Sequence, residues 1–269
     1  VNSMGIPVPA EEGGSSLVST TALPAGFINQ VNSLYPEKQN VKDADFSKNS
    51  DLRVVGKNGA EVWVTYIGDG NFYLNNMNTY NSLMYYNYIE SELSSMNSLT
   101  PATLHMTMLL PNTNQMYCPA GLKLQLLYWD GNQYSKTFPE GTRIGFAVAR
   151  EGYKCNGAPI TDASAYSFKR IIGSTLYPQK DGDVRGNYYS TPQLNQVGKS
   201  QAVTRWIEDY GYCVTGLDIR PIGNAKSDYD FNDVLIAVSS SPIPDAIQPG
   251  TVIDPVEVAV ASESTYGTL

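Results

Sequence analysis

The sequence feature that most restricts the fold is a succession of short apolar segments separated by turn-forming residues. Residues 103–110 alternate apolar and polar side chains, which is the period of a half-buried strand, and residues 143–150 are typical of a core strand. We expect further strands at residues 51–55, 61–67, 83–88, 122–129, 166–172, 202–207, 212–219 and 234–238. Because strands and helices do not alternate, the pattern predicts an all-β chain folded as an antiparallel β-sandwich of jelly-roll type.

Local signals add one helix and two tight turns to this pattern. Between residues 24 and 35 apolar residues recur at the spacing of one helical face, and Pro36 ends the pattern, which predicts one short N-terminal helix. The residues of that face are Phe27, Ile28, Val31, Leu34 and Tyr35. The pairs Asn58-Gly59 and Asp130-Gly131 are typical of two-residue turns, so we expect a β-hairpin at each.

The two ends of the chain differ in composition from its centre. Residues 1–22 contain Pro, Gly, Ser and Thr without a helix or strand period, and they predict a disordered linker. Residues 241–269 are rich in Pro and predict a second linker, while residues 23–240 are long enough for one β-sandwich domain. We expect the chain to be a fragment of a longer surface protein in which a further C-terminal domain follows.

Composition narrows the classes of partner and the compartment. A net charge of −8 and a pI near 4.7 argue against nucleic acid and anionic membrane as partners and favour cations. Abundant Tyr with few charged residues is typical of a secreted or surface-exposed β protein. No apolar run is long enough to cross a bilayer, so we expect no membrane insertion by this segment. Cys118, Cys155 and Cys213 leave open either one disulfide with one buried thiol or three buried thiols.

An acidic motif at residues 228–233 is the strongest candidate for a ligand site. It reads Asp-Tyr-Asp-Phe-Asn-Asp and runs directly into the apolar residues 234–238. In an extended backbone Asp228, Asp230 and Asn232 would point to one side and the two aromatic residues to the other. Carboxylates this close repel one another, and Ca²⁺, which takes several oxygen ligands, offsets that repulsion. The motif therefore predicts a calcium-binding loop at the entrance of a strand.

The motif begins like an EF-hand loop and then departs from that pattern. Asp233 stands where the EF-hand needs Gly, Ser239 stands where it needs a bidentate Glu, and a strand follows in place of a helix. A solvated acidic turn, in which the Asp and Asn side chains bond their own backbone, is the alternative interpretation. Asp181 and Asp183 predict a second, weaker calcium site, for which an ordinary turn is again the alternative.

Five motifs between residues 50 and 240 resemble, in their order, the bacterial domain-of-unknown-function family 4114. They are Asn81-Ser-Leu-Met-Tyr-Tyr86, Gly141-Thr-Arg-Ile-Gly-Phe146, Leu194-Asn195-Gln196, Gly216-Leu-Asp218 and Ser227-Asp-Tyr-Asp-Phe-Asn-Asp-Val234. That family is common in surface and secreted proteins and often stands beside an LruC-type domain in Bacteroidetes proteins. The last residues, Gly267-Thr268-Leu269, are similar to the first strand of an LruC-type domain.

The resemblance implies a β-sandwich whose acidic motif is a calcium site. The family usually carries a Glu-Asp pair on the strand before the motif, whereas this chain has Leu217 and Asp218, so one ligand is missing. Met84 takes the place of a family Gly. The expected ligand set for Ca²⁺ is Asp218, Asp228, Asp230, Asn232 and Asp233.

These observations predict a non-enzymatic, calcium-binding module of a bacterial cell-surface or secreted protein that serves adhesion or display. Its partner would be a surface glycan or a protein, and its location extracellular or at the outer membrane, as a lipoprotein anchored through a removed N-terminus. A carbohydrate-binding module is the second hypothesis, because the chain combines a sandwich pattern, many Tyr residues and a calcium loop.

A glycan-acting enzyme is the third hypothesis. Carboxylates are available at Glu61, Glu90 and the pair Glu208-Asp209, and a two-carboxylate glycosidase has no sequence spacing of its own. However, the single histidine, His105, lies in a strand pattern, and no catalytic motif is present. The three Trp residues also lie in strand patterns, which predicts core packing for Trp63, Trp129 and Trp206.

Overall fold

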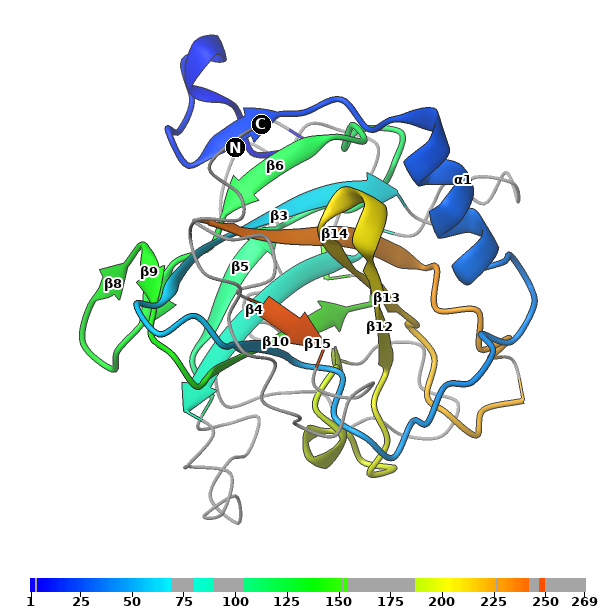
Figure 1. Ribbon diagram of the computed structural model, residues 1–269. Coiled ribbons are helices and arrows are strands. Elements are labelled where there is room, and N and C mark those ends of the chain that lie inside the picture. Colours follow the sequence, from blue (N-terminus) through cyan, green and yellow to red (C-terminus); the bar gives the residue numbers. More distant parts are fainter. Residues whose placement is uncertain are drawn as a thin grey trace.

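The computed structural model describes residues 1–2, 4–68, 80–89, 104–150, 152–153, 187–225, 227–241 and 247–249. In these residues the chain forms two larger antiparallel sheets, a two-stranded ribbon and one α-helix, arranged as a sandwich (Figure 1). The prediction of an all-β antiparallel sandwich with one short N-terminal helix is confirmed. The jelly-roll connectivity stays a prediction.

The first sheet has seven strands, and its longest strand, β3 (Ala60–Gly68), is mostly buried and pairs with three others. In order across the sheet it contains β1 (Val18–Thr20), β6 (Leu122–Gln125), β3, β14 (Val234–Ser241), β13 (Tyr212–Leu217) and β12 (Ala202–Ile207), and β9 (Thr137–Phe138) also pairs with β3. All of these pairings are antiparallel, with Val238 opposite Val64 and Ala237 opposite Val214. Strand β12 therefore forms one edge of this sheet.

The second sheet has six strands and lies against the first. In order it contains β15 (Ile247–Pro249), β2 (Leu52–Val54), β10 (Thr142–Ala149), β4 (Ser82–Ile89) and β5 (Met106–Leu110), and β11 (Asn187–Tyr189) also pairs with β10. The central strand β10 is buried along its whole length, as its apolar sequence predicts. The separate ribbon consists of β7 (Tyr128–Trp129) and β8 (Tyr134–Ser135).

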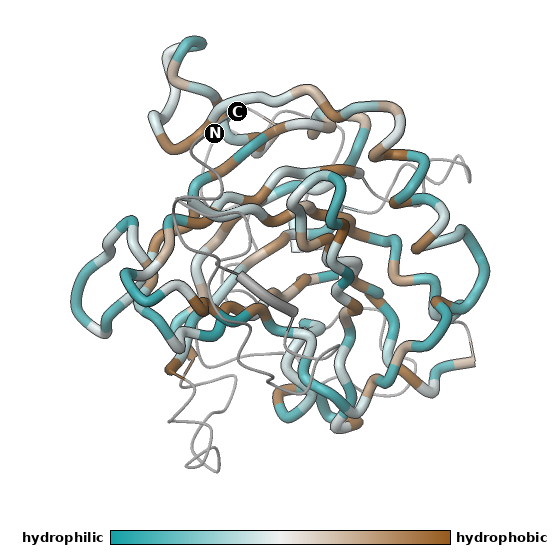
Figure 2. Tube along the Cα trace, viewed as in Figure 1, coloured by the Kyte–Doolittle hydropathy of each residue, from teal (hydrophilic) through white to brown (hydrophobic). Residues whose placement is uncertain are grey.

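Three clusters of buried apolar side chains hold the described part of the chain together. The main core fills the space between the sheets and includes Val62, Val64 and Tyr66 of β3 and Ile144 and Phe146 of β10. In the described part of the chain, hydrophobic residues concentrate along the strands and hydrophilic ones along the connections (Figure 2). Burial of this apolar surface is the main force that favours the sandwich.

The outer face of the first sheet is covered by helix α1 (Ala25–Leu34). Phe27 and Val31 are fully buried in a second apolar cluster together with Val214 of β13 and Ala237 of β14. The ring of Phe27 lies 5.2 Å from that of Tyr210. The predicted apolar helical face is confirmed, and it places the end of α1 next to the connection between β13 and β14.

The two predicted hairpins have different outcomes. Asp130-Gly131 does form one, with Trp129 opposite Tyr134, and the Asp130 carboxylate accepts hydrogen bonds from the turn backbone. The hairpin at Asn58-Gly59 is wrong, because β2 and β3 belong to different sheets. Gly59 has a positive φ of 77°, so it does reverse the chain, but β2 pairs with β10 and β15 on its two edges and not with β3.

The prediction of linkers at both ends needs correction. In residues 1–22, β1 pairs with β6, and both Ile6 and Val18 are buried in the main core, so this stretch is part of the sandwich. It has no period because only single side chains enter the core. Towards the other end, β14 extends to Ser241, and the strand at residues 247–249 pairs with β2.

Some predictions fall outside the described residues. These are the strand at residues 166–172, the second calcium site at Asp181 and Asp183, the residue Cys155 and the chain beyond residue 249. Cys118 and Cys213 are buried thiols in the main core. Within the described residues, no helix is long and apolar enough to cross a membrane.

Candidate metal centre

The acidic loop, residues 227–233, connects to the start of β14 and carries most of the predicted site. The expectation of an extended backbone is wrong, because Tyr229 and Phe231 have positive φ values of 55° and 53°. This left-handed conformation is uncommon for residues with large side chains and persists only where tertiary contacts enforce it. Those contacts are aromatic, since both rings stack on Phe46, at centroid distances of 6.0 Å and 5.0 Å.

Close packing fixes the loop against the first sheet. Phe231 is fully buried in the cluster under α1, and its carbonyl oxygen approaches Gly216 of β13 so closely that a Cβ on Gly216 would lie 2.1 Å from it. Only Gly allows this approach. The carbonyl oxygen of Tyr229 accepts a hydrogen bond from the backbone N–H of Val41 at 2.9 Å. The loop is therefore held between β13 and the segment that follows α1.

Asp230 lies in the middle of the acidic loop. It is buried, and its carboxylate accepts hydrogen bonds from the backbone N–H of Lys38 at 3.0 Å and of Asn232 at 3.4 Å. Burial raises the pKa of Asp230 to about 7, and the negative charges of Asp233 and Asp228 raise it as well. Because the ionised form of Asp230 is disfavoured in the fold, a bound cation beside it would be stabilising.

Asp218 lies just after β13 and faces the loop. Its carboxylate accepts hydrogen bonds from the backbone N–H of Arg220 and from the hydroxyl of Ser227, each at 2.7 Å. Burial raises the pKa of Asp218 to about 6, with smaller contributions from the charges of Asp230 and Asp228. The residue thus belongs to the same electrostatic cluster as the loop, although ten sequence positions separate Asp218 from Asp228.

Asp233 completes this cluster at the beginning of β14. Its carboxylate accepts a hydrogen bond from the backbone N–H of Ile219 at 3.0 Å. Enclosure of the carboxyl group raises the pKa of Asp233 to about 8, and the charge of Asp218 is the next cause.

The two remaining predicted ligands occupy different positions. Asp228 is exposed, and its charge acts on all three enclosed carboxyl groups. Asn232 is buried, and its side-chain N–H donates to Glu37 Oε2 at 3.0 Å, which leaves its Oδ1 without a hydrogen bond in the described structure. Sequence reasoning missed Glu37, since nothing local indicates that it lies near a residue 195 positions away.

The donor chemistry of the cluster fits a hard cation, because every side-chain donor is an oxygen. The structure brings together Asp218, Asp230 and Asp233, with Asp228 within electrostatic reach. As arranged, however, no group of three or more His, Cys, Asp or Glu residues in the described chain is positioned to hold a metal ion. Each enclosed carboxylate accepts a hydrogen bond from a backbone N–H, which fixes its orientation and leaves further lone pairs on the carboxylate.

The single histidine packs against aromatic residues of the β7–β8 ribbon, whereas the candidate carboxylate Glu90 lies outside the described residues. His105 stacks on Trp129 at 4.2 Å, and its Nε2 makes a 2.7 Å hydrogen bond with the hydroxyl of Tyr134. Partial burial lowers the pKa of His105. The predicted core packing of the three Trp residues is wrong, because Trp206 is 37% exposed and Trp63 and Trp129 are only half-buried.

No protein-family model matches the chain, and no curated protein or solved structure shows significant similarity to it. The resemblance to domain-of-unknown-function family 4114 therefore stays a prediction.

Proposed function

We propose that this chain is a calcium-stabilised, non-enzymatic module of a bacterial cell-surface or secreted protein that serves adhesion or display. The observation that supports this most is the enclosure of three carboxyl groups at the end of one sheet, with pKa values raised to about 6, 7 and 8. Such a cluster destabilises the fold at neutral pH unless protons or a cation neutralise it. The surface location, with anchoring as a lipoprotein, is proposed from composition and resemblance alone.

The ion would be held by Asp218, Asp228, Asp230 and Asp233, with Asn232 Oδ1 as a further oxygen ligand. A bound calcium ion supplies positive charge in place of the protons that the enclosed carboxyl groups otherwise retain. The protein orients the loop for this by the hydrogen bond from Lys38 and by the burial of Phe231. The role of the ion is structural, since it would join β13, β14 and the segment after α1.

Linkage gives the size of this effect. A ligand that binds only the folded state stabilises it by about 2.7 kcal/mol when its concentration is a hundred times the dissociation constant. Extracellular calcium modules work with weak affinity, in the range of about 0.1–1 mM. At such an affinity a hundredfold excess corresponds to about 10–100 mM CaCl₂, which a thermal unfolding experiment can supply.

Thermal unfolding in CaCl₂ and in EGTA tests the proposal. The parent protein and Asp218→Asn are compared with Asp130→Asn, a matched change of an exposed Asp in the β7–β8 turn. We expect calcium to raise the melting temperature of the parent and of Asp130→Asn by several degrees, and to have little effect on Asp218→Asn. Equal melting temperatures of the parent in the two buffers would contradict the proposal.

A further inference from the structure

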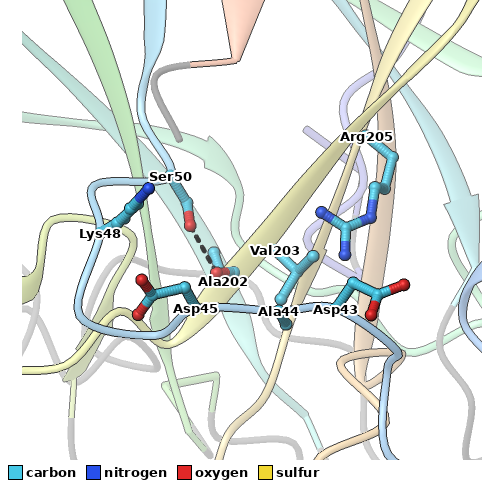
Figure 3. A pocket seen from close by; sticks show the side chains of 8 residues that line it. All are labelled: Asp43, Ala44, Asp45, Lys48, Ser50, Ala202, Val203 and Arg205. Atoms are coloured by element: carbon cyan, nitrogen blue, oxygen red, sulfur yellow. Dashed lines mark hydrogen bonds between the residues drawn. The ribbon is translucent and has the colours of Figure 1, made fainter. Parts of the chain in front are cut away.

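A cleft opens beside the edge strand β12, apart from the acidic carboxyl cluster. It has a volume of about 230 Å³ and lies between β12 and the segment of residues 43–50 (Figure 3). Four charged side chains line it, namely Asp43, Asp45, Lys48 and Arg205. The floor between them is formed by Ala44, Ala202 and Val203.

Several of these charged groups have unused hydrogen-bonding capacity. The Asp43 carboxylate and the Lys48 ammonium form neither a hydrogen bond nor an ion pair in the described structure. Arg205 uses only one guanidinium nitrogen, Nη2, which donates to the carbonyl oxygen of Lys42 at 2.8 Å. Asp45 Oδ1 accepts from the backbone and the hydroxyl of Ser47, and these hydrogen bonds lower the pKa of Asp45. Donors and acceptors are thus both available in the cleft.

The charges are arranged in two opposite pairs. Figure 3 shows the Asp43 carboxylate on the same side of the cleft as the Arg205 guanidinium, and Lys48 with Asp45 on the other side. The lining carries two negative and two positive side chains, so the formal charges cancel and the cleft presents little net field that would select an ion. A neutral ligand whose groups both donate and accept hydrogen bonds suits this arrangement, and its apolar face would contact Val203.

The cleft is preformed, because hydrogen bonds tie its two walls together. The hydroxyl of Ser50 donates to the carbonyl oxygen of Ala202 at 2.6 Å, and the hydroxyl of Thr204 donates to the carbonyl oxygen of Ser50 at 2.9 Å. A third hydrogen bond joins the same two walls, because the backbone N–H of Ser200, just before β12, donates to the carbonyl oxygen of Phe46 at 2.7 Å. A site that is rigid before binding loses little conformational entropy when the ligand enters.

We propose that this cleft binds one neutral sugar residue of a glycan. Hydroxyl groups of a sugar ring both donate and accept, so they can use the guanidinium of Arg205 and the ammonium of Lys48 as donors and the two carboxylates as acceptors. The volume is below the roughly 300–1,000 Å³ typical of drug-sized ligands, which limits the occupant to a single small ring. The inference goes beyond the calcium proposal and does not depend on it.

The test combines a glycan array of neutral monosaccharides and oligosaccharides with titrations followed by NMR, in CaCl₂ and in EGTA. The full chain is compared with Lys48→Met and Arg205→Met, and with Lys136→Met as a control that removes an exposed Lys outside the cleft. We expect a neutral sugar to bind with a millimolar dissociation constant and each cleft variant to weaken it at least tenfold. Lys136→Met should bind as the parent does.

The sugar-binding experiments have outcomes that support the proposal and outcomes that overturn it. An absence of chemical-shift changes with every neutral sugar in the NMR titrations, in both buffers, overturns the proposal. Sugar binding that Lys48→Met leaves unchanged also overturns it, because the site would then lie elsewhere. Preferential binding of glycylglycine, a zwitterion offered in the same titrations, overturns the neutral character of the ligand. Sugar binding lost in the cleft variants supports the proposal whether or not calcium alters the melting temperature. If Arg205→Met does not fold, Lys48→Met alone decides, since the exposed Lys48 makes no contact that the fold needs.

Discussion

Replacing Asp230 by Asn should stabilise the protein in the absence of calcium. The pKa of this carboxyl group rises from 3.8 to about 7 in the folded state. At pH 8 the group is ionised in both states, so its full unfavourable interaction with the fold is present. One pKa unit corresponds to about 1.4 kcal/mol, so the shift corresponds to about 4 kcal/mol as an upper limit.

Two effects reduce this figure for Asp230→Asn. Solvent at the open side of the loop screens the repulsion from Asp228, which is exposed. The substitution also replaces a charged acceptor of the Lys38 N–H by a neutral amide oxygen, a loss of about 1 kcal/mol. We therefore expect a net gain of about 1–2 kcal/mol in the free energy of unfolding.

Urea unfolding in EGTA at pH 8 measures this gain, with Asp130→Asn as the matched control. For a domain of this size the gain corresponds to a rise in melting temperature of about 3–6 °C. In saturating calcium the order should reverse, because the parent gains the stabilisation of the bound ion and Asp230→Asn does not. A variant that is less stable than the parent in EGTA would contradict this prediction, since it would show that the ionised carboxylate favours the fold.

Three further predictions follow from the same contacts. In EGTA the free energy of unfolding should fall as the pH rises from about 4 to about 8. The reason is that three carboxyl groups have folded pKa values above the unfolded value of 3.8 and hold protons longer in the folded state, namely Asp218, Asp230 and Asp233. Urea titrations across this pH range measure the change, and a rise in stability would contradict the prediction. Gly216→Ala should destabilise the protein by about 2–3 kcal/mol, because its Cβ would collide with the carbonyl oxygen of Phe231. The control is Gly68→Ala, where the added Cβ would meet the flexible end of the Gln115 side chain. Equal melting temperatures of the two variants would contradict the close approach of Phe231 to Gly216. Calcium should increase the affinity of the cleft for a sugar by a few-fold, because Phe46 stacks on Phe231 of the acidic loop and its carbonyl oxygen accepts a hydrogen bond from Ser200 beside β12. Sugar affinities measured in CaCl₂ and in EGTA test this, and equal values would show that the two sites are independent.

The sequence was sufficient for the features that depend on local periodicity. The apolar spacing of Phe27, Val31 and Tyr35 predicts the helix and its buried face, because a surface helix must bury one stripe of side chains. The core strand β10 is likewise evident from its composition. Both features are decided within a few residues of the chain, so no tertiary information is needed to find them.

Features that depend on distant partners could not be predicted in this way. Asn58-Gly59 indicates a reversal of the chain, but the pairing of β2 with β10 and β15 decides which sheet each strand joins. The sequence does not predict strand β1, because an edge strand of three residues is too short to show a period. In the candidate site, the residue types of the acidic motif predict the cluster, whereas the contact of Glu37 with Asn232 arises only from the packing of α1 on the sheet.

Isothermal titration calorimetry tests the central claim, that the acidic loop binds calcium, most directly. CaCl₂ is titrated at pH 8 into chelator-treated parent protein, into the double variant Asp218→Asn/Asp230→Asn and into the control Asp130→Asn. We expect a saturable heat of binding for the parent and the control, and none for the double variant. A parent that shows no saturable heat, or a double variant that binds calcium as the parent does, would contradict the claim.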